Sequence, residues 1–288
     1  MLKYISFLIF KLFLIFDKIL LLIFKKSFLL HFKNFIEKNI YKKIKILNND
    51  IKFFIPSPII AWRVDTFYSK EPETLEWINS FEKKNIVFWD IGANIGLYSI
   101  YNSLKNPNST TISFEPSTSN LRTLSRNISL NNLEKKIKIF PLPLSNKKNL
   151  FLEMKEGDFN EGAALNTFGE NFNFEGKNFK SENKYHLFGT TIDFLINQKI
   201  LAIPDYIKID VDGIEHLILY GATNSLKEKK VKSLSIEINE SFEDQLNSVL
   251  KIMNDNNFVL KSKKNNSDFF DNRSKFAKVF NYIFVRKD

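Results

Sequence analysis

A glycine-containing turn follows an apolar run in the first half of the chain. Residues 87–89 lead directly into Asp90, Gly92, Asn94 and Gly96, and a helical pattern comes next. In open α/β sheets, a strand, a glycine turn and a helix in this order bind a nucleotide at the carboxyl end of the strand. Glycine allows the backbone to turn tightly and to approach the ligand. The spacing therefore predicts a nucleotide site at this turn.

The next apolar run, 110–114, ends in Glu115, which lies 19 residues after Gly96. A carboxylate at this point can accept hydrogen bonds from both hydroxyls of a ribose. NAD requires a glycine where this chain has Asn94, and the charge of Asp90 disfavours a pyrophosphate. S-adenosylmethionine carries no phosphate, and Asp90 suits its ammonium group. We therefore predict S-adenosylmethionine as the cofactor, with a nicotinamide-dependent oxidoreductase as the alternative. The predicted cofactor-binding residues are Asp90, Gly92, Asn94, Gly96 and Glu115.

Three further carboxylates, Asp210, Asp212 and Glu215, follow the apolar run 206–209. They are expected at the same edge of the sheet, beside the cofactor. Transfer of a methyl group from this cofactor needs in-line alignment and, where the acceptor carries a proton, its removal, so these three are the candidate catalytic residues. Asp212 and Glu215 would serve equally well as caps of the following helix. The acids could also hold a divalent ion, which the sequence allows but does not imply.

Two more side chains near this edge have weaker assignments. Glu237 comes one residue before the end of the apolar run 231–238, where it faces the same cleft or pairs with a lysine. His216 is expected on the surface of a helix. The chain has three histidines and no cysteine, so we predict no thiolate or multi-histidine metal site.

Short apolar runs alternate with helical patterns from residue 85 onward, which indicates an α/β sheet, mostly parallel, with helices on both faces. Five glycines fall in one interruption, 155–189, which we interpret as a surface excursion or a lid. The expected strands are 51–55, 86–89, 110–114, 137–140, 206–209, 231–238 and 279–285. The expected helices are 71–78, 95–104, 117–130, 213–226 and 242–255.

Several of these segments together resemble the FkbM family of S-adenosylmethionine-dependent methyltransferases. The similar segments are FWDIGANIGLYSI (88–100), ISFEPSTSNLRTLSRNISLNN (112–132), PLPLSN (141–146), TTIDFL (190–195), YIKIDVDGIEHLILYGA (206–222) and LSIEIN (234–239). The resemblance implies a Rossmann-like class I methyltransferase fold. It also implies O-methylation of a hydroxyl, typically on a saccharide, a glycan or glycolipid precursor, or another hydroxylated small molecule. The family commonly has Glu where this chain has Asp212.

The positive charge of the chain, +10 in all, lies at its two ends. Residues 1–50 contain ten lysines and three acidic residues, whereas the middle of the chain is slightly acidic. Arginine is scarce, although it is the residue that favours base and phosphate recognition. We therefore predict no nucleic-acid partner.

The first 30 residues are dominated by Leu, Ile and Phe, with charges about seven residues apart. This pattern predicts an amphipathic helix in the interface of an anionic membrane. A tilted spanning helix over 4–24, and a helix packed on the body or on a partner, are the alternatives. No small-residue cleavage site follows, so we do not expect a cleaved signal peptide. The lysines that follow favour the cytoplasmic face of the membrane.

The expected organisation has three parts. Residues 1–45 are the membrane-associating helical segment, 46–84 are a lead-in strand and helix, and 85–288 are the methyltransferase domain. A non-catalytic, membrane-tethered scaffold is the remaining alternative, and the presence of Asp90, Glu115 and Asp210 argues against it.

Overall fold

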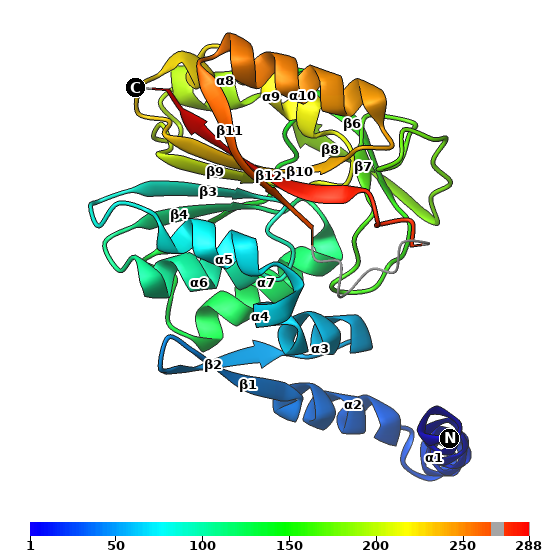
Figure 1. The fold of residues 1–288 in the computed structure, drawn as a ribbon. Coiled ribbons are helices and arrows are strands. Elements are labelled where there is room, and N and C mark those ends of the chain that lie inside the picture. The colour runs from blue at the N-terminus through cyan, green and yellow to red at the C-terminus, as the bar shows by residue number, and fades with distance from the viewer. Residues whose placement is uncertain (266–273, 288) are drawn as a thin grey trace.

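The computed structural model describes residues 1–265 and 274–287 (Figure 1). A seven-stranded sheet has the order β11-β12-β10-β9-β3-β4-β5, and β3, β4, β5, β9 and β10 run parallel. Strand β12 is antiparallel to β10, and β11 is antiparallel to β12. The bounds are β3 Val87–Ile91, β4 Thr110–Phe114, β5 Ile137–Phe140, β9 Tyr206–Ile209, β10 Ser233–Asn239, β11 Phe258–Lys264 and β12 Val279–Arg286. The predicted Rossmann-like sheet is confirmed.

Helices cover both faces of this sheet (Figure 1). On one face lie α5 (Pro72–Asn79), α6 (Leu97–Lys105) and α7 (Thr118–Leu130). On the other lie α8 (Ile192–Asn197), α9 (Glu215–Tyr220) and α10 (Glu243–Asp255). Each face has its own apolar core, one around Phe88 and Leu124 and the other around Trp89 and Ile236. Because both faces are covered, most positions of the parallel strands are buried, including polar ones such as Ser113 and Ser235.

The element bounds follow the sequence patterns closely, with one clear exception. The strands predicted at 110–114, 137–140 and 206–209 have those bounds in the structure. The helix predicted over 213–226 is interrupted: α9 ends at Tyr220, and the short 3-10 helix η1 (Ser225–Lys227) follows. At Gly221 the backbone packs against Ser145, and a Cβ would overlap the Ser145 carbonyl oxygen. This close approach ends the helix.

The lead-in to the sheet is more regular than its sequence suggests. Strands β1 (Tyr41–Ile46) and β2 (Asn49–Phe54) form an antiparallel pair, and helices α3 (Pro58–Asp65) and α4 (Phe67–Lys70) follow. Ile46 is fully buried. Residues 41–46 are thus joined to the body by strand pairing, and the N-terminal helical part ends at Asn39.

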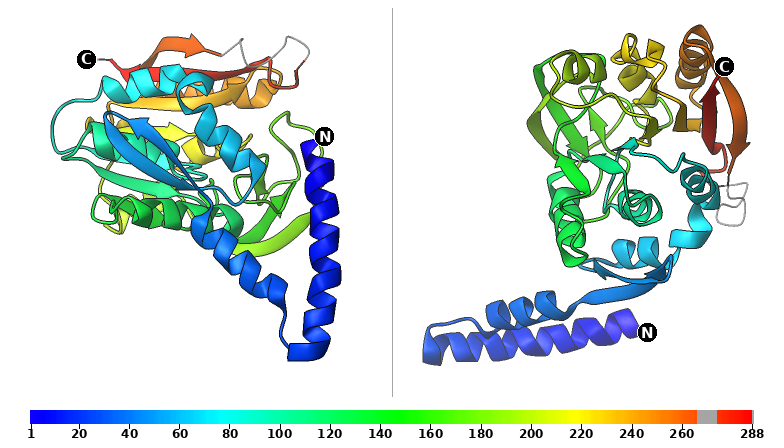
Figure 2. Two further views of the ribbon diagram at one scale, coloured as in Figure 1. Left: turned by 90° about the horizontal axis from the view of Figure 1, so that it is seen from below. Right: turned by 90° about the vertical axis from the view of Figure 1, so that its left-hand side faces the viewer.

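Helices α1 (Leu2–Phe24) and α2 (Phe28–Asn39) form a hairpin that projects from the body (Figures 1 and 2). Neither helix contains a buried residue. The Phe13 ring lies 5.1 Å from that of Phe32, and the Phe16 ring lies 5.5 Å from that of Phe28. Among the described helices, none combines the length and the apolar character that a bilayer crossing requires.

The excursion carries a small sheet of its own, with the order β7-β6-β8. Its strands are β6 (Leu150–Glu156), β7 (Thr167–Phe168) and β8 (Asn183–Gly189). The segment between β6 and β7 is tied to the lead-in by two hydrogen bonds. Ser57 Oγ donates to the Glu161 carbonyl at 2.6 Å, and Arg63 Nε donates to the Gly162 carbonyl at 2.8 Å.

Candidate active site

The glycine turn after β3 is packed between two neighbouring strand ends. Gly92 has φ +87°, and a Cβ there would overlap the carbonyl oxygen of Asp210, which follows β9. On the other side, the amides of Gly92 and Ala93 both donate to the Phe114 carbonyl at 3.0 Å. Gly96, with φ +88°, then begins α6. Glycine is required at position 92 because both the dihedral angle and the contact exclude a side chain.

Glu115 is buried at the end of β4 and faces this turn. Its Oε2 accepts from the Asn94 amide at 2.7 Å, and its Oε1 accepts from the Ser117 amide at 2.8 Å. Burial raises the pKa of the Glu115 carboxyl to about 8, although the two amides oppose that shift. Asn94 is also held by its side chain, which donates to the Ala163 carbonyl at 2.9 Å. The predicted carboxylate and the predicted turn are therefore in direct contact.

Two adjoining cavities lie at this edge of the sheet. The narrower one has a volume of about 70 Å³, and Glu115 lines it together with apolar side chains that include Phe114, Leu144 and Met154. The wider one has a volume of about 400 Å³. The residues that line both are Gly92, Asn94, Ala163, Ala164, Asp210 and Asp212. The arrangement provides a narrow slot, with Glu115 among apolar walls, that meets a wider chamber at Asp210 and Asp212.

Asp210 lies where the two cavities meet. Its Oδ2 accepts from the Lys208 ammonium at 2.6 Å. Lys208 is only 2% exposed, and although burial opposes its charge, Asp210 and Glu71 raise its pKa above the usual value. A buried ammonium group therefore lies directly behind the Asp210 carboxylate.

Asp212 also lines both cavities, with its backbone in the left-handed region at φ 64°. Its Oδ2 accepts from the amide of Leu165, in the excursion, at 2.7 Å. Burial and the neighbouring Asp210 charge raise the pKa of Asp212 to about 6. Asp212 therefore joins the loop after β9 to the segment that covers the site.

The structure does not bring Glu215 to either cavity. Its carboxylate accepts from the amides of Val211 and Gly213, at 2.9 and 3.0 Å, and from the side chain of Gln245. Burial raises the pKa of Glu215 to about 7. These contacts hold the loop after β9 in shape, and among the described residues no side chain caps the start of α9.

Asp90 and His216 also lie apart from the cavities. Asp90 is 1% exposed and accepts from Ser99 Oγ at 2.5 Å, and burial raises its pKa. The structure therefore does not place Asp90 where it would meet a ligand's ammonium group. His216 is 7% exposed and packs beside the rings of Phe172 and Phe242, so its expected position on a helix surface is wrong.

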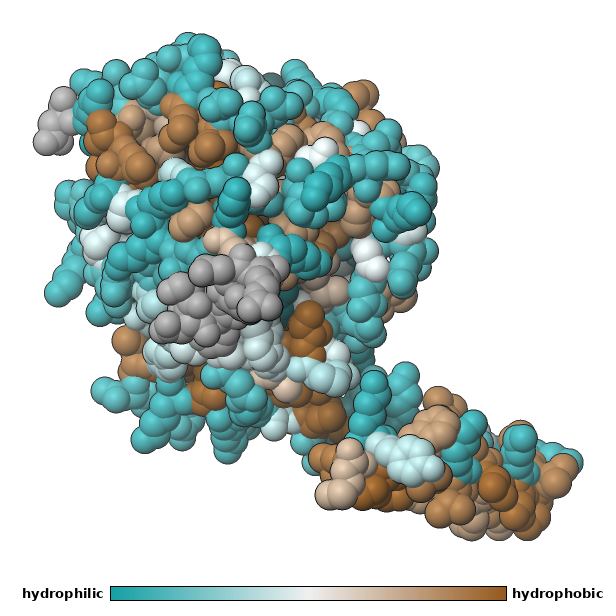
Figure 3. Space-filling model, turned by 45° about the vertical axis from the view of Figure 1, so that its right-hand side comes forward, coloured by the Kyte–Doolittle hydropathy of each residue, from teal (hydrophilic) through white to brown (hydrophobic). Residues whose placement is uncertain are grey.

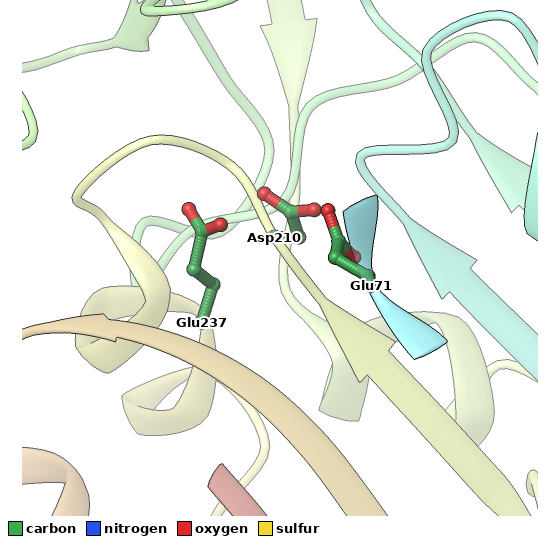
Figure 4. Close-up of side chains that lie close together, drawn as sticks. All are labelled: Glu71, Asp210 and Glu237. Atoms are coloured by element: carbon green, nitrogen blue, oxygen red, sulfur yellow. The ribbon is translucent and has the colours of Figure 1, made fainter. Parts of the chain in front are cut away.

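Two glutamates complete an acidic group around Asp210 (Figure 4). One carboxylate oxygen from each of Glu71, Asp210 and Glu237 lies within 4.8 Å of the others. Glu237 faces the cleft, which was one of its two expected positions. Glu71 was expected only at a helix start, and no local signal links it to the distant Asp210.

The charges in this group are balanced by lysines. Burial disfavours the Glu71 carboxylate, but the ammonium groups of Lys70 and Lys208 outweigh that effect and lower its pKa to about 2. Burial and the Asp210 charge raise the pKa of Glu237 well above its usual value. Three carboxylates at this spacing suit a divalent cation. Lys70 and Lys208 compete with such a cation, because they already contact Glu71 and Asp210 at 2.5 and 2.6 Å.

Comparisons with solved structures find folds similar to this one. A methyltransferase FkbM from Methylobacillus flagellatus KT is 16% identical, with a TM-score of 0.46 over 71% of this chain and 44% of that chain. A precorrin-6y C5,15-methyltransferase from Geobacter metallireducens GS-15 is 14% identical, with a TM-score of 0.44 over 76% and 87% of the two chains. The present chain spans less than half the length of the Methylobacillus protein. No curated protein matches it.

A family of protein domains also matches this chain. Residues 90–260 match the family described as the methyltransferase FkbM domain. This range begins at the acidic residue of the glycine turn and includes Glu115, Asp210, Asp212 and Glu237. It also contains the whole excursion, and it spans more than half of the chain. The chain therefore belongs to the FkbM methyltransferase family.

Proposed function

We propose that this methyltransferase takes its methyl group from S-adenosylmethionine and transfers it to a hydroxyl of a saccharide or of a glycan or glycolipid precursor. The observation that carries the proposal is the position of Glu115, at the glycine turn and beside a cavity that leads to Asp210. A nucleoside held by Glu115 would have its substituent directed toward Asp210 and the wider chamber.

The residues around the narrow cavity fit the donor. Glu115 is positioned to accept the two ribose hydroxyls, since each carboxylate oxygen can accept more than the one amide it now binds. Gly92 lets the turn approach the Asp210 backbone closely, and Phe114, Leu144 and Met154 offer apolar walls for a flat base. When bound, S-adenosylmethionine supplies an electrophilic methyl group on a positively charged sulfur.

The wider cavity suits a hydroxylated acceptor. Trp62 and Phe174 provide aromatic surface, and Glu73 and Asn281 provide hydrogen-bonding groups. A few polar groups set among apolar walls are typical of small-molecule sites. Asp210, at the junction, accepts the hydroxyl proton as the acceptor oxygen takes the methyl group. Lys208 orients that carboxylate from behind.

The alternative of a nicotinamide-dependent oxidoreductase is disfavoured by the family and by the turn. A dinucleotide needs glycine at the intermediate position so that its pyrophosphate can approach the backbone. Here Asn94 occupies that position, and its side chain is bonded to Ala163. Family membership likewise disfavours a non-catalytic scaffold.

Methyl transfer from labelled S-adenosylmethionine to fractionated cell glycans and lipids tests the function directly. We expect label in a saccharide-containing fraction, stable to base as an ether is, and none with the Asp210→Asn variant. Label only in protein or nucleic acid would refute the proposed acceptor. Calorimetry with S-adenosylhomocysteine and with NADH tests the proposed donor independently of the acceptor. Tight binding of NADH alone would refute the proposed donor.

A further inference from the structure

The α1–α2 hairpin exposes an apolar surface that the body of the protein leaves uncovered. Leu12, Ile15 and Leu22 are 67%, 59% and 74% exposed. In Figure 3 the hairpin stands apart from the body as a mostly hydrophobic projection. Single-chain soluble proteins rarely expose a continuous apolar patch of more than a few hundred Å². An apolar surface of this kind indicates a site that binds another protein or a membrane.

The hairpin is held together by its own contacts. Phenylalanine rings of the two helices are in contact, and hydrogen bonds add to this. Asp17 of α1 accepts from Ser27 Oγ at 3.0 Å and from the Leu29 amide at 2.9 Å. The one acidic side chain of α1 therefore caps the start of α2. Within residues 1–265 and 274–287, no other element buries an apolar side chain of α1 or α2.

The charges of the hairpin indicate the kind of surface that covers it. Lys3, Lys11, Lys18, Lys25 and Lys26 are exposed, and within the described part of the chain no carboxylate pairs with any of them. A second copy of the hairpin would bring these like charges together. An anionic lipid surface instead offers acidic head groups to the lysines and acyl chains to the apolar side chains.

The hairpin is also attached to the body at defined points. Arg122 pairs with Glu37 of α2 at 3.2 Å, and Arg126 donates to the Glu37 carbonyl at 2.9 Å. The Arg126 guanidinium lies 3.8 Å from the centre of the Phe54 ring. These contacts set the direction in which the hairpin leaves the body.

That direction puts the hairpin on the same side of the body as two elements that line the wider cavity. Helix α3 and the segment after β6 contribute Trp62 and Leu165 to the wider cavity. In Figures 1 and 2 both of these elements lie on the side of the body where α1 runs. We infer that the α1–α2 hairpin lies in the interface of an anionic bilayer and keeps the side of the body that carries α3 toward the lipid surface.

Flotation of the full-length protein with lipid vesicles tests this inference. We expect binding to phosphatidylcholine vesicles that contain phosphatidylglycerol, weaker binding to pure phosphatidylcholine, and a decrease with salt for the anionic vesicles. Binding of S-adenosylhomocysteine serves as the control for folding, because none of the changed residues touches the site.

Two sets of variants test separately how the apolar side chains and the lysines of the hairpin contribute to vesicle binding. The double variant Leu12→Gln with Leu22→Gln should weaken binding to both kinds of vesicle by at least about tenfold. Phe151→Gln is its control, because Phe151 is 71% exposed on β6, outside the hairpin. Replacing Lys3, Lys11 and Lys18 by Gln should weaken binding to anionic vesicles by about fivefold for each lysine. The control replaces the exposed body lysines Lys83, Lys199 and Lys229 by Gln.

Three results would overturn the inference. One is a full-length protein that stays with the unbound fraction on anionic vesicles. Another is binding that the leucine variant leaves unchanged. The third is a dimer in light scattering that the leucine variant dissociates while vesicle binding is absent, since this would assign the surface to a second copy of the chain.

Discussion

Replacing Glu115 by alanine should weaken the binding of a ribonucleoside ligand by an amount that depends on pH. The carboxyl is buried, and its pKa is raised to about 8. About one Glu115 in eleven is therefore ionised at pH 7, and about ten in eleven at pH 9. Ribose hydroxyls donate hydrogen bonds, so they bind the ionised carboxylate better than the neutral acid. The ligand must supply the cost of ionising Glu115 at the lower pH.

The expected loss of affinity follows from the hydrogen bonds to the ribose and from the cost of ionising Glu115. Two hydrogen bonds to a charged group contribute about 3 kcal/mol in all, which corresponds to about a hundredfold in affinity. Ionising a group of pKa about 8 at pH 7 costs about 1.4 kcal/mol, or about tenfold. Glu115→Ala should therefore cost about tenfold at pH 7 and about a hundredfold at pH 9.

Calorimetry with methylthioadenosine is the suitable assay, because this ligand keeps the ribose but lacks an amino acid group that titrates in this range. The affinity of the unchanged protein should rise about tenfold from pH 7 to pH 9, and that of Glu115→Ala should stay flat. Glu134→Ala, at an exposed position shortly before β5, is the control. An unchanged affinity in a folded Glu115→Ala protein would remove Glu115 from the ribose site.

Three further predictions concern turnover, folding and pH. Asp210→Asn should reduce turnover by about 10²-fold or more with little loss of S-adenosylhomocysteine affinity. Near-normal turnover would leave Asp210 a structural role. Turnover that is lost in EDTA and restored by Mg²⁺ would assign the acidic residues to a metal site. Gly92→Ala should lower the free energy of unfolding, measured with denaturant, by about 2 kcal/mol or more, because Gly92 has a φ of +87° and contacts Asp210. Gly157→Ala is the control, because position 157 has room for a Cβ, and it should change the denaturation midpoint little. The pKa values of Glu115 and Glu215 are raised to about 8 and about 7 in the native state. The native protein therefore keeps protons on these groups that the unfolded chain releases above about pH 4.5. Their contribution to stability is lost as the pH rises toward 8. The melting temperature should therefore fall between about pH 5 and about pH 8, and a melting temperature that rises over this window would contradict these shifts.

The sequence by itself determined the sheet and the place of the glycine turn. The parallel strands are short segments whose apolar residues are buried because both faces of the sheet are covered, and their limits are visible as changes in composition. Gly92 marks the turn, since no other residue fits its backbone, and Glu115 is located by the apolar strand that it ends. These features depend on neighbours in the chain, so a local pattern is enough to find them.

Tertiary structure alone decided which acidic side chains share the site. Glu71 and Glu237 meet Asp210 because the ends of distant elements converge at one edge of the sheet, and nothing near Glu71 in the sequence signals this. Asp90 and Glu215, whose positions in the sequence suggested ligand contact, turn to internal hydrogen bonds. In each case the direction of the side chain depends on packing against residues far away in sequence, and local patterns do not carry that information.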